Sequence, residues 1–140
     1  VNLVEIGGAE LALLLALGAS HETGGHQIAG ARYRFDPDCP SPADLDGSGT
    51  VDAWERGCVC WVEVGGKPLD PARRYRVALN NFMFDGGDNL APAMRGATLL
   101  TEGPLVRDAI VDSVGKHAGC VDEQPLVDPA QPRIEVGPCP

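Results

Sequence analysis

The sequence has few aromatic residues, few basic residues and no apolar stretch of membrane-spanning length. Aromatic side chains make up 5% of the 140 residues, and 11 Lys and Arg stand against 20 Asp and Glu, a net charge of −9. This excess of acidic residues argues against nucleic acid or an anionic membrane as the main partner, and it is compatible with the binding of cations. The longest apolar run, residues 11–17, is much shorter than the roughly 20 residues of a membrane-spanning helix.

The sequence also lacks an initial Met and the basic, apolar leader that directs secretion. It opens inside an apolar stretch, residues 1–6, that is typical of a strand. We therefore expect these residues, which suit one domain, to be a fragment of a longer protein. On that expectation, the missing leader carries no information about the compartment.

Cysteine is present, but not in the spacing of a zinc site. None of the five cysteines forms a CxxC pair, and the three histidines lie elsewhere in the sequence. Cys39 with Cys58 or Cys60 brackets one loop, and Cys120 with Cys139 brackets the C-terminal tail. This spacing favours two disulfides with one thiol left over, rather than five free thiols in a cytosolic protein. Disulfides would indicate that the protein is secreted, periplasmic or on the cell surface.

Apolar spacing and turn residues predict an α+β fold, a mixed sheet with hairpins packed by two main helices. The first helix is expected at residues 9–17, which are apolar on nearly every side, and the second runs from Pro104 to about His117. A short helix is expected at residues 90–94, and residues 80–89 are expected to form a loop. The predicted strands are 1–6, 27–36, 58–64, 75–79, 97–100 and 133–136.

An acidic loop at residues 44–55 matches the calcium loop of an EF-hand position by position. Oxygen-bearing side chains recur at the spacing of the ligands, Gly49 falls where the chain must turn sharply, and Thr50 falls where a backbone carbonyl binds. Calcium takes about six to eight oxygen ligands, and this spacing wraps them around one point. The predicted Ca²⁺ ligands are Asp44, Asp46, Ser48, Thr50, Asp52 and Glu55.

The alternative for this loop is a solvated acidic turn. Prolines at positions 37, 40 and 42 exclude a proper entering helix, and the strand expected at 58–64 shortens the exiting helix. Because nothing in the sequence suggests a second, paired hand, we expect a structural role for bound Ca²⁺ rather than a sensor role.

Several motifs in order resemble the C-terminal domain of 5′-nucleotidases, the family that includes UDP-sugar hydrolases and 2′,3′-cyclic phosphodiesterases. A GKPLDP turn at 66–71 precedes a strand with Tyr75, and Asn81-Phe82 and Gly86-Gly87-Asp88 follow. Further similar landmarks are residues 8–11, 27–33, 103–109 and 132–134. The resemblance covers nearly the whole chain and implies a 5′-nucleotidase C-terminal domain-like fold, in which residues 38–58, with the acidic loop, are an insertion.

The resemblance implies a domain that binds the base and sugar of a nucleotide, or a related phosphate ester, and is not catalytic alone. In this family an N-terminal metallophosphoesterase domain holds two divalent metals and hydrolyses the substrate. Phe82 matches one of two rings that clamp the base, and Asp88 matches the acid that contacts the ribose. The first ring and the phosphate-binding arginines would lie before Val1. The predicted substrate-binding residues are Asn81, Phe82, Gly86, Gly87 and Asp88.

The residues themselves leave alternatives open. A Phe ring can stack on a base and an Asp can accept two ribose hydroxyls, but Phe82 and Phe84 could equally be core residues, with Asp88 capping the helix expected at Leu90. Asn89 stands where the family usually has Gly. It keeps a second function open: a Ca²⁺-stabilised structural or adhesive module that has lost nucleotide binding. The sequence shows no nucleophile elbow and no two-metal hydrolytic centre, so no catalytic residue is predicted.

Overall fold

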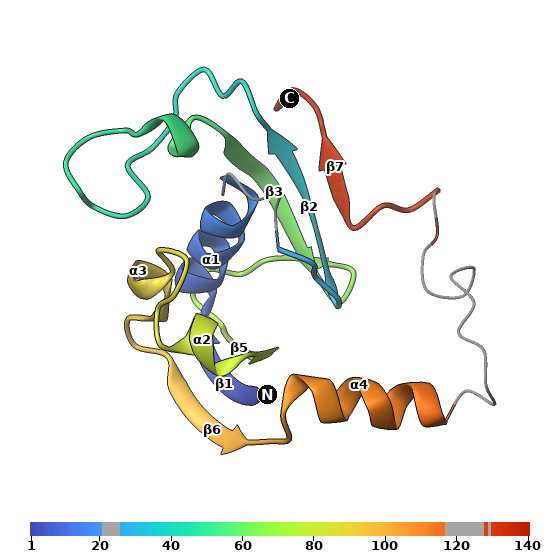
Figure 1. The fold of residues 1–140 in the computed structure, drawn as a ribbon. Coiled ribbons are helices and arrows are strands. Elements are labelled where there is room, and N and C mark those ends of the chain that lie inside the picture. Colours follow the sequence, from blue (N-terminus) through green and yellow to red (C-terminus); the bar gives the residue numbers. More distant parts are fainter. Residues whose placement is uncertain (21–25, 117–127, 129) are drawn as a thin grey trace.

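The computed structural model describes residues 1–20, 26–116, 128 and 130–140, which form two β-sheets with helices packed on and between them (Figure 1). The α+β class predicted from the sequence is confirmed. The elements are β1 (Asn2–Gly7), α1 (Gly8–Ser20), β2 (Ala31–Asp36), the 3-10 helix η1 (Ala53–Glu55), β3 (Cys58–Val64), β4 (Lys67–Pro68), β5 (Arg74–Leu79), α2 (Asn81–Phe84), α3 (Ala91–Met94), β6 (Thr98–Glu102), α4 (Val106–Gly115) and β7 (Ile134–Val136).

The first sheet is built around β1, which pairs antiparallel with β5 on one side and with β6 on the other. Alternate residues of β1 are buried, and Val4 and Ile6 are fully enclosed. The chain passes from β1 directly into α1, and only glycine fits at Gly8, because a Cβ there would collide with the carbonyl of Asp70. The Gly8 N–H donates to the carbonyl of Arg73 at 2.7 Å, which holds this turn against the start of β5.

The α1 helix lies between the two sheets and forms the centre of the core (Figure 1). Its sequence is apolar on nearly every side, and the helix accordingly packs against the first sheet, against β3 and against α3. Four of its leucines are buried: Leu11, Leu14, Leu15 and Leu17. Each fully buried leucine stabilises the fold by about 1.5–3 kcal/mol, so α1 is the largest single contribution to the core.

The second sheet has the strand order β4-β3-β2-β7. The hairpin predicted at Gly65-Gly66 is confirmed, since β3 and β4 pair antiparallel and both glycines have positive φ, 59° and 74°. The C-terminal β7 runs parallel to β2, although about a hundred residues separate them in the sequence. Glu135 of β7 accepts hydrogen bonds from Arg32 and Arg34 of β2 at 3.1 and 2.8 Å, which holds the C-terminal strand in place.

Two disulfides tie the chain to β3. Cys39 bonds to Cys58, and Cys60 bonds to Cys139, with 5.5 Å between the Cα atoms of each pair. The first is one of the pairings that the spacing favoured, and it closes the acidic insertion. The expected pairing of Cys120 with Cys139 is wrong for Cys139, because β7 carries the tail alongside β2 and brings Cys139 to β3. Cys120 lies outside the described residues.

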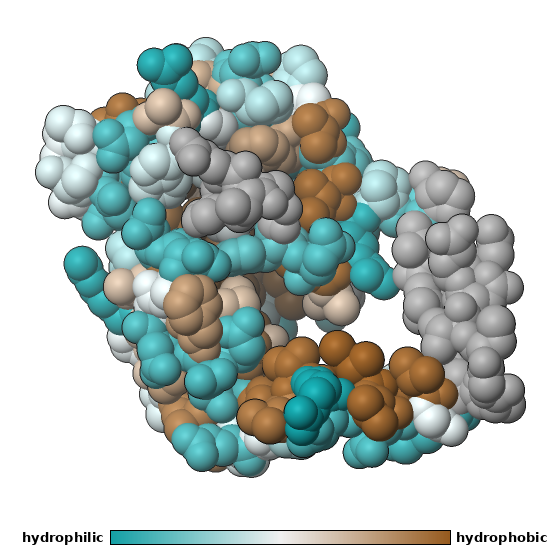
Figure 2. Space-filling model, viewed as in Figure 1, coloured by the Kyte–Doolittle hydropathy of each residue, from teal (hydrophilic) through white to brown (hydrophobic). Residues whose placement is uncertain are grey.

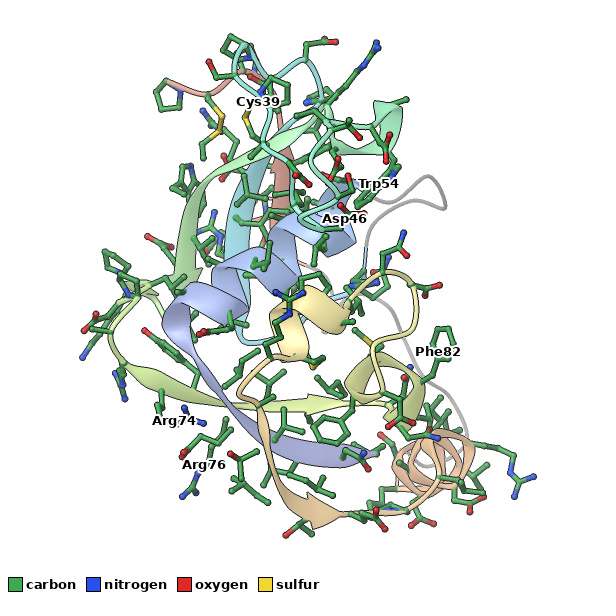
Figure 3. All side chains as sticks on the ribbon, turned by 90° about the vertical axis from the view of Figure 1, so that its left-hand side faces the viewer. Cys39, Asp46, Trp54, Arg74, Arg76 and Phe82 are labelled. Carbon is green, nitrogen blue, oxygen red and sulfur yellow. A yellow bond between two sulfur atoms is a disulfide. The ribbon has the colours of Figure 1, made fainter. Side chains whose placement is uncertain are left out.

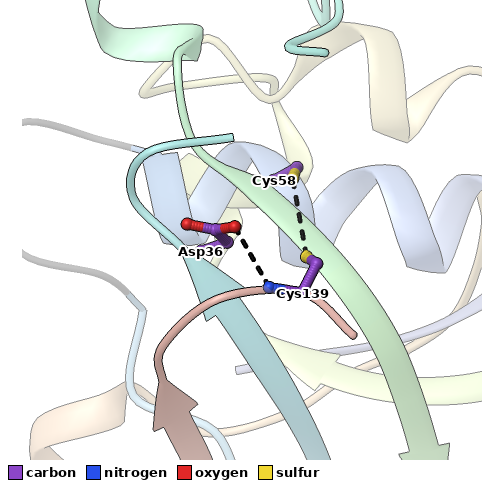
Figure 4. Close-up of side chains that lie close together, drawn as sticks. All are labelled: Asp36, Cys58 and Cys139. Atoms are coloured by element: carbon purple, nitrogen blue, oxygen red, sulfur yellow. Dashed lines mark hydrogen bonds between the residues drawn. The ribbon is translucent and has the colours of Figure 1, made fainter. Parts of the chain in front are cut away.

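A buried carboxylate fastens the same tail. Asp36 at the end of β2 accepts hydrogen bonds from the N–H of Cys139 at 3.1 Å and from the N–H of Asp38 at 3.0 Å (Figure 4). The Sγ atoms of Cys58 and Cys139 lie 3.7 Å apart beside it. Because both sulfurs are already in disulfides, they offer no thiolate ligands. We therefore assign this group to structure rather than to a metal site.

The second long helix, α4, differs from the expectation of a packed helix. It begins after Leu105, and it has no buried residue. Four aliphatic side chains of α4 are exposed, and so is that of Leu105 directly before it. The four are Val106, Ile110, Val111 and Val114. Figure 2 shows the apolar surface that gathers along this helix. Among the described residues, no helix is long and apolar enough to cross a membrane.

Candidate functional site

The segment that carries the predicted substrate-binding residues follows β5 and begins with a short helix rather than the expected loop. The side chain of Asn80 accepts a hydrogen bond from the N–H of Met83 at 2.7 Å and so caps α2. This cap was missed in the sequence, although Asn directly before an apolar run is a recognisable helix-start signal. Asn81 is the first residue of α2 and is exposed.

The two phenylalanines of α2 have different environments. Phe84 is half-buried and packs against the core, whereas 55% of Phe82 is exposed. Figure 3 shows Phe82 pointing outward from the domain. The expectation that either ring could be a core residue is therefore resolved in favour of Phe84, and Phe82 presents a free aromatic face.

The two glycines shape the loop under this ring. A Cβ on Gly87 would collide with the ring of Phe82, so the ring lies directly on the glycine backbone. Gly86 has φ of 87° and approaches Ala91 so closely that a Cβ would lie 2.9 Å from the Ala91 Cβ. The pair therefore has a physical requirement for glycine: one position takes a left-handed backbone and the other supports an aromatic ring.

Asp88 and Asn89 follow with φ of 54° and 59°, the described non-glycine residues in the left-handed region. Asn and Asp tolerate this region better than most residues, but two in succession are unusual, and such strain concentrates at binding and catalytic sites. The fully buried Leu90 anchors the loop directly afterwards. The N-cap position of α3 is Leu90, whose side chain makes no capping hydrogen bond.

The acidic loop is folded by its own backbone. Asp44 accepts hydrogen bonds from the N–H groups of Gly47, Ser48 and Gly49 at 2.8, 3.0 and 2.7 Å. The bond from Gly49 is the main cause that lowers the pKa of Asp44 below its ordinary value, and the other two act in the same direction. Asp44 therefore stays ionised in a loop that contains three further carboxylates.

Glu55 is the buried member of the acidic loop, with no exposed surface. One of its carboxylate oxygens accepts from the N–H groups of Leu45 and Asp46 at 2.7 and 3.2 Å, and the other accepts from Asp52 at 2.8 Å. Leu45 and Trp54 pack against the core and hold the loop to the domain. Glu55 therefore links both ends of the predicted calcium loop.

Three of the six predicted calcium ligands converge. Asp44, Asp46 and Glu55 each offer a carboxylate oxygen within 4.8 Å of the others. Asp52 is exposed and lies outside this group, and the hydroxyl of Ser48 is 3.1 Å from the carbonyl of Thr50. Figure 3 shows Asp46 and Trp54 apart from Phe82. The acidic loop and residues 81–89, here called the Phe82 loop, are therefore two separate candidate sites.

Comparison with known proteins agrees with the family that the motifs resembled. The family model described as the 5′-nucleotidase C-terminal domain matches residues 1–96. The chain belongs to this family. In the family this is the substrate-binding domain, which pairs with an N-terminal catalytic domain, and family members are metallophosphoesterases. A search of curated proteins gave no match.

Two solved structures share the fold over 96% of this chain. One is a 5′-nucleotidase precursor from Thermus thermophilus, with 29% identity and a TM-score of 0.67. The other is the sulfate thiohydrolase SoxB of Thermus thermophilus in complex with glycerol, with 28% identity and a TM-score of 0.58. The chain covers only 25% and 22% of the length of these two proteins.

Proposed function

We propose that this chain is the nucleotide-binding domain of a longer, secreted or periplasmic metallophosphoesterase of the 5′-nucleotidase type, here called the parent protein. The observation that carries the proposal is the exposed ring of Phe82 held on the backbone of Gly87. A free aromatic face on a preorganised loop is suited to stacking on a base, because the ring needs no rearrangement before it binds.

In this proposal, the residues of the Phe82 loop contact different parts of the nucleotide. Phe82 stacks on the base, and Asp88, whose carboxylate can accept two hydroxyl donors, binds the ribose. Gly86, Gly87 and Asn81 set the path of the backbone around the ligand. The two divalent metals that hydrolyse the phosphate ester belong to the N-terminal domain of the parent protein, and this chain supplies orientation rather than catalysis. The two disulfides support an oxidising compartment for the parent protein.

The test of this binding mode is a titration of the 140-residue chain with adenosine 5′-monophosphate, followed by amide chemical shifts. We expect the largest shifts between residues 81 and 89 and much smaller ones with ribose 5-phosphate, which lacks a base to stack. Equal shifts with both ligands, or shifts outside this segment, would contradict the role of Phe82.

We also propose that the acidic loop binds Ca²⁺ with a structural role. The three converging carboxylates and the buried charge of Glu55 support a cation there. A ligand present at a hundred times its dissociation constant stabilises the native state by about 2.7 kcal/mol, which for 140 residues raises the Tm by roughly 9 °C. Removing Ca²⁺ with EDTA should therefore lower the Tm of the chain but not that of the Asp46→Asn variant, and an unchanged Tm in both excludes a structural site.

The Ca²⁺ site also motivates the second candidate function. A module stabilised by Ca²⁺ that has lost nucleotide binding would keep the acidic loop and fail the titration above. Asn89 favours this alternative, because the family usually has Gly at this position of the loop. Nucleotide hydrolysis by the parent protein would exclude it.

A further inference from the structure

The two disulfides of the domain lie side by side at one end of β3. Cys58 and Cys60 are two positions apart on this strand, and each is bonded to a cysteine of another segment. The Sγ atoms of Cys58 and Cys139, which belong to different disulfides, are only 3.7 Å apart (Figure 4). Because a disulfide bond is about 2.05 Å long, these two sulfurs are within a side-chain rotation of bonding to each other.

The backbones of Cys58 and Cys139 are both held on β2, independently of either disulfide. Cys58 pairs with Asp36 in the ladder between β2 and β3. On the tail side of β2, the Gly137 N–H donates to the carbonyl of Phe35 at 3.0 Å. The Cys139 N–H donates to the carboxylate of Asp36 at 3.1 Å. The two sulfurs therefore stay neighbours when one of the disulfides is reduced.

Cys39 is attached differently, because it begins the segment 39–58, here called the acidic segment, which contains the whole acidic loop. Its disulfide with Cys58 joins the two ends of this segment. All four cysteines of the two disulfides are half-buried rather than enclosed, and Asp38 and Pro40 on either side of Cys39 are exposed. A thiol reductant can therefore reach this end of β3.

We propose that the two disulfides form an exchange pair, in which reduction of either one moves the remaining bond to Cys58–Cys139 and releases the acidic segment. The reductant is a dithiol, on a protein or a small molecule. It gives two electrons and two protons to one disulfide and is itself oxidised to a disulfide. The exchange that follows is internal to the chain.

Two routes lead to the same product. Reduction of Cys39–Cys58 leaves a thiolate on Cys58, which attacks Cys139, and Cys60 departs as a thiolate. Reduction of Cys60–Cys139 leaves a thiolate on Cys139, which attacks Cys58, and Cys39 departs instead. This second step transfers no electrons, since one sulfur–sulfur bond forms as another breaks, and the departing thiolate takes up the proton that the attacking thiol lost.

The product keeps the tail fastened and frees the acidic segment. The new bond closes a separation of 81 residues, against 79 for Cys60–Cys139, so the tail remains tied to β3 by a loop of nearly the same length. Cys39 has lost its partner in both routes. The part of the fold that responds to a reductant is therefore the acidic segment.

The experiment maps disulfides in variants on a Cys120→Ser background, so that only the four cysteines of the exchange pair are present. In Cys39→Ser, the Cys58 thiol lies beside the Cys60–Cys139 disulfide. After incubation at about pH 8.5, the ordinary pKa of a thiol, alkylation and mass spectrometry should find Cys58–Cys139 in at least about a tenth of the molecules. Cys60→Ser should give the same linkage. Cys58→Ser is the matched control and should keep Cys60–Cys139 alone.

A double variant, Cys39→Ser with Cys60→Ser on the same background, isolates the product of the exchange. Only Cys58 and Cys139 remain in it, and we expect the folded protein to contain their disulfide and no free thiol.

Hydrogen exchange of this double variant measures the release of the acidic segment. The amides of Leu45 and Asp46, which donate to Glu55, should exchange at least about tenfold faster than in the unaltered chain. The amides of β7 should exchange at the same rate in both, because the tail keeps a disulfide. Both proteins are measured in EDTA, so the proposed binding of Ca²⁺ does not contribute.

Three results overturn the proposal. One is Cys39→Ser with the Cys60–Cys139 linkage alone and an alkylated Cys58. Another is mixed pairing of the three remaining cysteines in Cys58→Ser, which would make the exchange unspecific. The third is unchanged exchange of the Leu45 and Asp46 amides in the double variant. Because no readout uses a nucleotide or Ca²⁺, failure of the nucleotide titration or of the EDTA test leaves the exchange pair standing.

Discussion

Replacing Phe82 with alanine separates a binding role from a packing role, because the ring is more exposed than buried. Its exposed fraction of 55% leaves 45% of the side chain in contact with the protein. Full burial of a phenylalanine stabilises a fold by about 1.5–3 kcal/mol, so Phe82→Ala should destabilise the 140-residue chain by only about 0.7–1.4 kcal/mol. This corresponds to a fall in Tm of roughly 2–5 °C.

The expected effect on substrate recognition is larger. Stacking of an aromatic ring on a base contributes about 1–3 kcal/mol, which converts to a loss of about 5- to 160-fold in affinity. In the proposed binding mode the ring contacts the base and not the reacting phosphate. We therefore expect Phe82→Ala to raise KM for a nucleoside monophosphate by this factor and to leave kcat nearly unchanged.

Phe84→Ala is the matched control, since Phe84 lies on the same short helix but packs against the core. Its removal should cost more stability, approaching the roughly 3 kcal/mol seen for core phenylalanines, while KM at a temperature well below the Tm stays close to that of the unaltered protein. The reasoning is refuted if Phe82→Ala leaves KM unchanged, or if both variants raise KM equally.

Three further predictions concern the loops and the disulfides. The Cys60–Cys139 disulfide closes a separation of 79 residues, and replacing both cysteines should lower the free energy of urea unfolding by about 4.5 kcal/mol. Replacing Cys39 and Cys58, with a separation of 19, should lower it by about 3 kcal/mol. A peptide that links Cys120 to Cys139 in mass spectrometry would contradict this pairing. Asn89→Gly should keep or slightly raise the Tm, whereas Asn89→Val should lower stability by about 1–2 kcal/mol, and the opposite order would show that φ at this position is not left-handed. Because the pKa of Asp44 is lowered in the fold, its contribution to stability is present above the ordinary pKa of about 3.9 and is lost as pH falls through the lowered value. The Tm of Asp44→Asn should therefore lie below that of the unaltered chain at pH 7, and the difference should disappear as the pH falls through the lowered value.

The parts of the fold that the sequence predicted well are those set by neighbours along the chain. The strand at 58–64 was predicted with the bounds that the structure has, since its mostly apolar run ends at two glycines. The hairpin and the buried first helix followed from equally local patterns. The candidate binding residues 81–88 also lie close together simply because they are contiguous in the sequence, and their role in binding stays a prediction.

What failed depends on contacts between distant segments. The disulfide between Cys139 and Cys60 could be inferred only from the parallel pairing of β2 with β7, and no local sequence pattern predicts that pairing. The periodicity of residues 106–115 predicted a helix, and the helix is present, but periodicity does not say what the apolar side contacts. Likewise, two phenylalanines two positions apart could not be ranked by exposure until α2 and Gly87 were seen to hold one outward and one inward.

Glu55 shows how the acidic loop can be both a local fold and a cation site. A carboxylate with no exposed surface is costly to bury unless it is hydrogen-bonded or paired, and three backbone N–H groups donate to Glu55. Each carboxylate oxygen has two lone pairs, so Glu55 can accept these hydrogen bonds and still ligate a cation beside Asp44 and Asp46. If Ca²⁺ performs this role, Glu55→Gln should abolish the effect of EDTA on the Tm while the loop keeps its disulfide, and a surviving EDTA effect would place the ion elsewhere.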